Sequence, residues 1–158
     1  MTHAAPLEPP KFLDLLKDLG SRSFNGYVAW VGEGLDGLEE GTVVFLNGKA
    51  VAIGYTQLKY NRSFDGEQAV APAMNVIRAK NVVYSVVSLT VPKVNLILAF
   101  NDKAKISPMP PEKLWSFVPK EYSDEYVRGI IKTLPPSDID RIRVLAEYGL
   151  VNVKVGEI

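Results

Sequence analysis

The chain of 158 residues contains no cysteine and a single histidine, His3. Without cysteine there is no disulfide, no thiolate nucleophile and no zinc–thiolate site. His3 precedes the first regular element in a proline-rich segment, where nothing would orient its imidazole, so histidine-dependent triads and multi-histidine metal sites are excluded as well. We therefore expect a protein that is not an enzyme and that has no metal site and no cofactor; only a carboxylate-based enzyme would escape this argument.

An excess of charge of one sign and a long apolar run are also missing. Eighteen Lys and Arg residues balance eighteen Asp and Glu residues, so no overall field attracts the chain to nucleic acid or to an anionic membrane. No segment approaches the roughly 18 consecutive apolar residues of a spanning helix, and the first residues lack the basic and apolar regions of a signal peptide. We expect a cytoplasmic protein, and the scarcity of thermolabile residues is compatible with a thermophilic source.

The residues that are present favour an α+β fold. Apolar residues make up 47% of the chain, which is enough for a packed core. The clearest local signal is the pair of β-prone runs 42–46 and 49–55, separated by Asn47-Gly48, because this dipeptide is typical of a two-residue hairpin turn. Residues 24–31 and 81–91 also read as strands. We predict a small antiparallel β-sheet with this Asn-Gly hairpin, flanked by helices.

Helices are predicted on both sides of these strands. Apolar residues at helical spacing indicate a helix over 11–19, ended by Gly20, and a second over about 66–80 that Pro72 should kink or interrupt. Residues 94–100 are almost wholly apolar and lean towards helix rather than strand. After Pro119, Ser123 and Ser137 each begin a helix of a C-terminal pair, and residues 150–155 could add a final strand.

These elements suggest four parts of the chain. Residues 1–10 are expected to be a flexible tail, and residues 11–106 an α+β domain. Residues 107–122 contain several prolines and are expected to be a connector. Residues 123–158 form the helical C-terminal region.

Residues 32–37, Gly-Glu-Gly-Leu-Asp-Gly, match the dinucleotide-binding pattern G-x-G-x-x-G. That pattern works when the glycine loop opens a helix whose N-terminus holds the pyrophosphate, whereas the element predicted next is a strand. The neighbouring acidic side chains would also repel phosphate. We interpret the segment as a flexible acidic hairpin loop, with Glu39 and Glu40 on a solvated face.

The loop over residues 55–64, of which 59–64 are polar and irregular, is the best candidate for a recognition surface. It carries Tyr55, Tyr60, Arg62 and Phe64, and aromatic residues and arginine dominate interaction hot spots. Two alternatives stay open: the rings simply cover the open end of the sheet, or a pocket beneath them binds a small ligand as in a sensor domain.

Nucleic-acid binding by the C-terminal helix pair is a further alternative, with Arg141 and Arg143 as the contacts. Residues 123–158 hold five basic and six acidic residues, however, and a reader of DNA or RNA needs a basic face. We expect nucleic acid to be an unlikely partner and the pair to dock against the rest of the chain.

The middle of the chain resembles the PATAN-like domain family and related uncharacterised archaeal proteins. The resemblance is carried by Phe24-Asn25-Gly26-Tyr27, by residues 40–45 and 47–52 of the hairpin, and by Gly66-Glu67-Gln68-Ala69. It implies a small antiparallel sheet flanked by helices, used as a regulatory or protein-interaction module in prokaryotic cells, with no catalytic motif. We therefore expect a non-catalytic adaptor that binds a protein partner or a second copy of itself.

Overall fold

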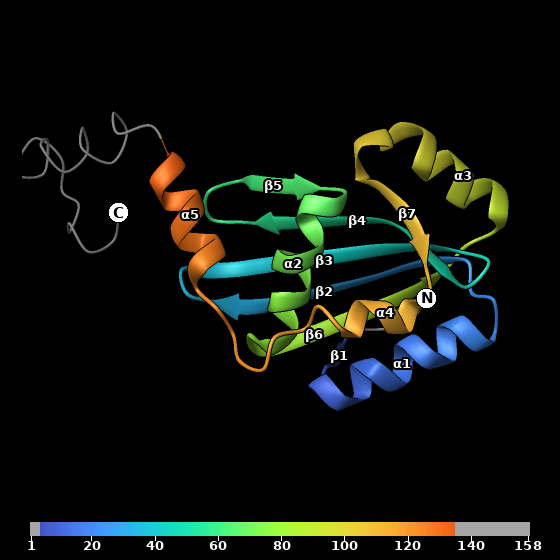
Figure 1. Ribbon diagram of the computed structural model, residues 1–158, viewed down its shortest axis with the longest axis horizontal. Helices are drawn as coiled ribbons and strands as arrows, with labels where there is room; N and C mark the ends of the chain where they lie inside the picture. The colour runs from blue at the N-terminus through green and yellow to red at the C-terminus, as the bar shows by residue number, and fades with distance from the viewer. Residues whose placement is uncertain (1–3, 135–158) are drawn as a thin grey trace, which may run out of the picture. The chain divides into compact units, whose positions relative to one another are not determined.

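The computed structural model describes residues 4–134 of the chain. In this part, seven strands form one antiparallel sheet and five α-helices accompany it, so the predicted α+β class is confirmed (Figure 1). The strands are β1 (Ala5–Pro6), β2 (Gly26–Gly34), β3 (Gly37–Leu46), β4 (Lys49–Gln57), β5 (Arg62–Asp65), β6 (Lys80–Ser88) and β7 (Lys105–Met109). The helices are α1 (Pro9–Ser21), α2 (Glu67–Asn75), α3 (Val91–Phe100), α4 (Pro111–Trp115) and α5 (Glu125–Thr133).

The chain divides into two compact units, Met1–Val127 and Arg128–Ile158, and the sheet belongs to the first. Helix α5 is the first member of the predicted C-terminal pair. At its start, the N–H of Glu125, the first helical residue, donates a hydrogen bond of 3.3 Å to the Ser123 hydroxyl oxygen, as expected of a helix start. The second helix of the pair and the strand over 150–155 lie outside the described residues. None of the helices in residues 4–134 is long and apolar enough to cross a membrane.

The predicted hairpin is the centre of the sheet. Strands β3 and β4 pair with Leu46 opposite Lys49, and the two residues between them have positive φ angles, 51° at Asn47 and 77° at Gly48. Both angles are required by the turn that matches the right-handed twist of the strands. The prediction made from the Asn-Gly dipeptide is confirmed.

The strand order is β1-β6-β2-β3-β4-β5, and β7 pairs with the same edge of β4 as β5 does. Strand β5 occupies one end of this edge, from Gly54 to Gln57, and β7 the other, from Ala50 to Ala52. The outer edge of β4 is therefore covered by two short strands rather than one long one.

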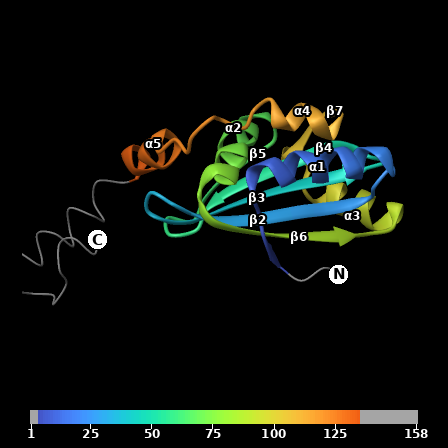
Figure 2. The same ribbon diagram turned by 90° about the horizontal axis from the view of Figure 1, so that it is seen from below.

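Alternation along the strands separates two faces of the sheet. On one face lie Trp30 and Phe45, covered by α1, α2 and α4; the Trp30 ring meets Phe12 of α1 edge-on at 5.5 Å, and its Nε1–H donates a hydrogen bond of 3.1 Å to the carbonyl of Ala73 in α2. On the other face, α3 packs its buried Val94 against Val44 and its neighbours. Figure 2 shows this arrangement from the side, with α3 on the face opposite α2 and α4.

Helix predictions hold with shifted boundaries. Helix α1 extends over Pro9–Ser21, and residues 94–100 are helical, as part of α3. The segment 66–80 forms α2 and then a 3₁₀ turn over Val76–Arg78, so the α-helix continues through Pro72 for three further residues.

The expectation of a flexible tail over residues 1–10 is wrong from Ala5 onward. Ala5 and Pro6 pair with Tyr84 and Val83 of β6, and the buried side chain of Leu7 follows them. The partner strand lies nearly eighty residues further along the chain, which a local pattern does not reveal.

The proline-rich segment 107–122 is likewise not a simple connector. Its first residues belong to β7, which adds to the sheet, and α4 buries Leu114. Proline suits this place because β7 is an edge strand and because Pro111 stands in the first turn of α4.

Two further segments expected to be irregular are strands. Strands β2 and β3 extend through most of residues 32–41, leaving a turn at Leu35 and Asp36, and residues 62–65 form β5. The G-x-G-x-x-G segment therefore belongs to a β-hairpin, which confirms that no helix follows it.

Gly41 provides a test of how the Trp30 ring is packed between the sheet and the helices. A Cβ atom at Gly41 would overlap the indole ring of Trp30, which is fully buried and held by its hydrogen bond to Ala73. We expect Gly41→Ala to lower the free energy of unfolding by about 1–3 kcal/mol through overpacking. Urea denaturation measures this change.

Gly54→Ala is the matched control. Its added Cβ would meet nothing closer than 3.5 Å, an ordinary contact with Asp65. We expect a change within about 0.5 kcal/mol for this variant. Equal destabilisation by the two substitutions would contradict the packing described for Trp30.

Candidate functional site

The four residues predicted from segment 55–64 lie close together in sequence but differ in position. Tyr55 is only 1% exposed and faces the helices, and Phe64 stacks on it with ring centroids 5.9 Å apart. Tyr60 lies in the turn between β4 and β5, and Arg62 is exposed at the start of β5. Of the four, only Arg62 presents its side chain freely to solvent.

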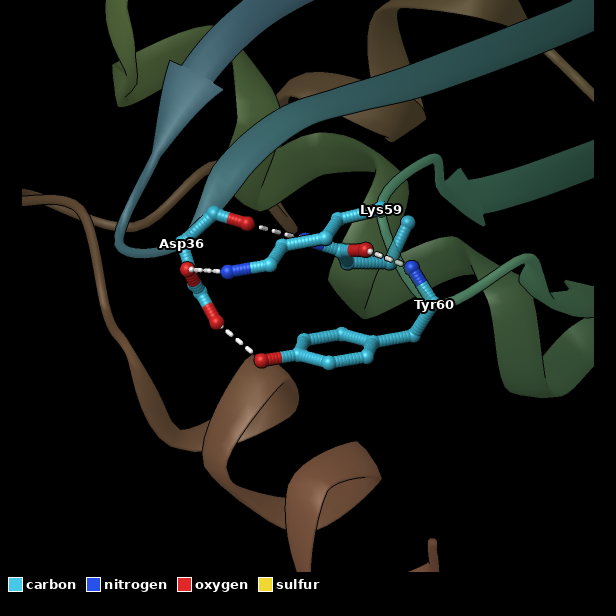
Figure 3. A network of polar contacts seen from close by, with 4 residues as sticks. Asp36, Lys59 and Tyr60 are labelled. Carbon is cyan, nitrogen blue, oxygen red and sulfur yellow. Dashed lines mark hydrogen bonds and ion pairs between the residues drawn. The ribbon is translucent and has the colours of Figure 1, made fainter. Parts of the chain in front are cut away.

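A polar network joins this turn to the turn between β2 and β3 (Figure 3). The Asp36 carboxyl forms an ion pair of 2.8 Å with the Lys59 ammonium and accepts a short hydrogen bond from the Tyr60 hydroxyl. The buried Gln57 amide donates to the Asp36 carbonyl at 2.7 Å and accepts from the Tyr60 N–H at 2.9 Å. The contacts from Lys59 and then Tyr60 hold the pKa of the Asp36 carboxyl below its ordinary value.

Next to this network, the carboxyl group of Glu39 is completely buried. Its two oxygens accept hydrogen bonds of 2.5 Å from the hydroxyls of Tyr55 and Tyr122, and the Tyr122 hydroxyl accepts a further bond of 3.0 Å from the Leu35 N–H. We call Glu39, Tyr55 and Tyr122 the Glu39 clasp. The expectation that Glu39 lies on a solvated face is wrong.

Glycines make room for this carboxyl group. A Cβ atom at Gly34 would overlap the carboxyl of Glu39 and would lie 2.6 Å from the Tyr122 hydroxyl. Gly37, the first residue of β3 after the turn, has a φ of 98°. Two glycines of the G-x-G-x-x-G segment therefore serve the hairpin and the Glu39 clasp.

The side chains of Asn75 and Arg78 tie the segment that carries Tyr122 to the rest of the first unit. Buried Asn75 exchanges two hydrogen bonds with the backbone of Ser123, at 2.7 and 2.8 Å. The Arg78 Nε–H donates to the carbonyl of Pro119 at 2.8 Å, and its guanidinium lies 5.7 Å from the centre of the Trp115 ring. Together with Tyr122, these contacts fasten residues 115–123 along the end of α2.

An open groove of about 910 Å³ lies beside Tyr122. Its charged lining residues are two basic and three acidic: Arg78, Lys80, Glu33, Glu121 and Asp124. Charges of both signs line the groove, so it does not select ligands of one sign.

The other end of the sheet carries an exposed apolar surface. Helix α3 buries Val94, yet Leu96 is 59% and Phe100 81% exposed on its opposite side. Pro92 and Ala99 are exposed at helical spacing from these two residues. We call Pro92, Leu96, Ala99 and Phe100 the α3 stripe; Figure 1 shows α3 at one end of the sheet and the turn between β2 and β3 at the other.

The chemistry available to the two ends differs. At the polar end, Glu39 is enclosed by two phenols and meets no ligand unless Tyr122 moves away. Within residues 4–134, no three His, Asp or Glu side chains stand close enough to hold a metal ion. At the apolar end, exposed rings and aliphatic chains offer contact area for association. Arg141 and Arg143, the predicted nucleic-acid contacts, lie outside the described residues.

Two of these features were missed from the sequence. Glu39 stands in a run of acidic residues, and only its place in alternation with Gly41 and Val43 could have indicated an inward direction. The α3 stripe had a stronger signal, because residues 94–100 contain a single polar residue and so leave the helix without a polar face.

Comparison with known families gives one match. A family model described as "Uncharacterized protein conserved in archaea (DUF2226)" matches residues 3–101. None of the curated proteins and none of the solved structures matches the chain. The match confirms the resemblance to uncharacterised archaeal proteins.

Loss of one phenol tests the Glu39 clasp. Tyr122→Phe removes a hydrogen-bond donor to the buried Glu39 carboxyl and the acceptor of the Leu35 N–H. We expect the free energy of unfolding to fall by about 1–3 kcal/mol, the cost of buried polar groups left without a partner. Urea denaturation measures the loss, and Tyr27→Phe, on the other face of the sheet, is the control. A Tyr122→Phe variant as stable as the control would show that the clasp contributes nothing.

The same phenols make stability depend on alkaline pH. Burial, followed by the hydrogen bond to Glu39, raises the pKa of Tyr55 and of Tyr122 above the ordinary value of 10.0. Above pH 10 the unfolded chain releases these protons while the folded chain keeps them. We therefore expect the two phenols to contribute their full stabilisation below pH 10. Above pH 10 the free energy of unfolding should fall, by up to about 1.4 kcal/mol per pH unit for Tyr55.

Denaturation at a series of pH values, with phenolate absorbance as a second signal, checks this dependence. Tyr122→Phe should lose stability less steeply than the wild-type chain above pH 10. This comparison cancels the titration of lysines that the two proteins share. Identical slopes would contradict a raised pKa at Tyr122.

Proposed function

This chain belongs to the family of uncharacterised proteins conserved in archaea, and we propose that it is a non-catalytic adaptor that binds a protein partner through α3. The proposed partner is a folded polypeptide with an apolar surface. The observation that carries the proposal is the exposure of the α3 stripe.

Exposure on this scale is unusual for a helix of such composition. Eight of the ten residues of α3 are apolar if Pro92 is counted, and a helix that is apolar all round is normally buried on all sides. In α3, Val94 is buried while Phe100 is 81% exposed. Burial of an exposed phenylalanine or leucine side chain against a partner stabilises the complex by about 1.5–3 kcal/mol before the entropic cost of association.

The polar end of the first unit supports a non-catalytic role. The Glu39 carboxyl and the Asp36 carboxyl both have partners within the chain, and Tyr55 is buried. Their hydrogen bonds join turns and segments that are distant in sequence, so stabilising the fold accounts for them. The hydrogen-bonding capacity that a substrate would need is already used.

The PATAN-like resemblance supports a regulatory setting for this interaction. The layout that it implies, a helix, a run of antiparallel strands and a helix opened by Gly66, is present as α1, β2 to β4 and α2. We propose that the chain is a PATAN-like module of this kind.

Small-ligand sensing is favoured by one observation. A pocket of about 300 Å³ lies between α3 and the sheet, lined mainly by apolar residues and by Asp65. Its volume is at the lower limit of ligand pockets, and Asp65 is exposed. We therefore prefer the adaptor function. Nucleic-acid binding through Arg141 and Arg143 stays a prediction from the sequence.

Substitution of Phe100 tests the adaptor. Phe100→Glu places a charge in the middle of the proposed contact, where a partner would have to desolvate it. We expect the amount of each specific partner captured by the variant to be about one tenth or less of the amount captured by the wild-type chain, as for a hot-spot residue. Affinity capture from an extract of the native host, quantified by mass spectrometry, measures the difference.

Leu58→Glu is the matched control. Leu58 is 44% exposed in the turn that follows β4, at the end of the sheet away from α3. The control should retain the partners of the wild-type chain. If Phe100→Glu and Leu58→Glu retain the same proteins in the same amounts, α3 is not the binding surface and the proposal fails.

A further inference from the structure

We propose that the pocket between α3 and the sheet binds a small organic cation, a primary amine joined to an apolar body such as a phenyl ring. This inference goes beyond the adaptor function and does not depend on it, because the exposed Leu96 is not among the residues that line the pocket. Two rows of cross-strand neighbours form the floor of the pocket, and they differ in chemistry.

The first row is apolar. Tyr27 of β2, Val44 of β3 and Ala52 of β4 are paired neighbours, so their side chains share one face of the sheet. Val44 and Ala52 are buried, and Ile97 of α3 packs against this row. An apolar body placed here is removed from water without leaving a polar group unpaired.

The second row is polar and has a gap in its middle. Thr42 of β3 pairs with Gly54 of β4, which in turn pairs with Asp65 of β5. Neighbouring strands are about 4.8 Å apart, so roughly 10 Å separates the strands of Thr42 and Asp65, and Gly54 places no side chain between them. Gly54 is not among the glycines with a positive φ, so the backbone does not require glycine here. The missing side chain instead leaves space in the pocket.

The polar groups around this gap are hydrogen-bond acceptors. The Asp65 carboxylate points towards the gap, since a Cβ atom at Gly54 would lie 3.5 Å from one of its oxygens. Within residues 4–134, neither this carboxylate nor the Thr42 hydroxyl has a hydrogen-bond or ion-pair partner. The Asn101 amide donates to the Ile97 carbonyl at 2.8 Å, which leaves the Asn101 side-chain oxygen as an acceptor. An ammonium group, which carries only donors, is complementary to this set.

The charges around the pocket favour a cation. Among the described residues that line it, Asp65 is the charged one and none is basic. Asp65 also borders an adjoining groove with Asp102 and Lys103, where Asp102 pairs with Lys105 at 3.0 Å and Lys103 forms no ion pair with Asp65. Because Asp65 is exposed, the ammonium group of a ligand can reach it at the mouth of the pocket while the apolar body lies over the first row.

The volume of the pocket defines the size of the ligand. An apolar cavity of about 150 Å³ holds benzene, so a pocket of about 300 Å³ holds on the order of twelve non-hydrogen atoms. The lysine side chain of another protein, with about five such atoms, would fill less than half of it. We expect a free small molecule, bound with a dissociation constant on the order of 1 mM because the pocket is small and open.

Ligands with the same body and different heads test the role of charge. 4-Phenylbutylamine should bind the full chain, 4-phenyl-1-butanol about fivefold more weakly and 4-phenylbutyrate at least about tenfold more weakly, because Asp65 attracts only the ammonium group. NMR titration, followed at the amide signals of Gly54 and Ala104, measures each dissociation constant. Equal binding of the amine and the alcohol would overturn the inference, and so would an amine that does not bind at about 20 mM.

n-Butylamine tests the apolar row. It has the ammonium group and the chain of a lysine side chain but no ring, so it should bind at least about tenfold more weakly than 4-phenylbutylamine. Equal affinities would show that Asp65 attracts amines only as a surface charge, and the pocket would then not be the binding site.

Substitutions locate the binding in the pocket. Asp65→Asn should weaken the binding of 4-phenylbutylamine about fivefold, to the affinity of the alcohol, whereas Asp14→Asn on α1 should leave it unchanged. Gly54→Leu fills the gap and should weaken the amine and the alcohol alike, with circular dichroism as the check of folding. Asp65→Asn changes only an exposed side chain and decides the outcome if Gly54→Leu does not fold. An Asp65→Asn variant that binds the amine as tightly as the wild-type chain would contradict the proposed site.

Discussion

Burial of the Glu39 carboxyl group is the constraint on which one whole end of the sheet depends. A carboxyl group removed from water is costly unless its oxygens are hydrogen-bonded, and Tyr55 and Tyr122 supply these bonds. Tyr122 reaches Glu39 because Asn75 and Arg78 hold its segment in place, and Gly34 leaves the space that the carboxyl fills. Gly34 in the hairpin, Tyr55 in β4 and the segment after α4 that carries Tyr122 thus all serve to bury and hydrogen-bond the same carboxyl group.

The elements that could be predicted from the sequence are those specified by neighbouring residues. The Asn-Gly hairpin needs only two positive φ angles and two β-prone runs, and α1 needs only its apolar spacing. Strands β1, β5 and β7 are short and depend on partners elsewhere in the sheet, so composition identified them as tail, loop and connector. The prolines led to two wrong predictions, the tail over residues 1–10 and the connector over residues 107–122, because an edge strand and the first turn of a helix both accept proline.

The candidate sites show the same contrast between features specified by neighbouring residues and features that depend on distant ones. Tyr55 and Tyr60 were predicted to be recognition residues, but their hydroxyls donate hydrogen bonds to Glu39 and Asp36, which are distant in sequence. Within the acidic run, only the alternation of Glu39 with Gly41 and Val43 indicates that this glutamate points inward. The exposed side of α3 could have been inferred from its uniform apolar composition, but which side faces water depends on how α3 lies on the sheet.

The two ends of the sheet therefore stand in contrast. At the polar end, interactions within the chain satisfy the buried carboxyl and amide groups, and new partners there would have to displace them. At the α3 end, Leu96 and Phe100 have apolar surface in excess of what the sheet beneath can cover. Free energy is gained most readily where surface is exposed and unengaged, so association at α3 leaves the rest of the first unit undisturbed. Under the proposed adaptor function, substitutions on the exposed side of α3 would change the partner, while the Glu39 clasp keeps the opposite end of the sheet unchanged.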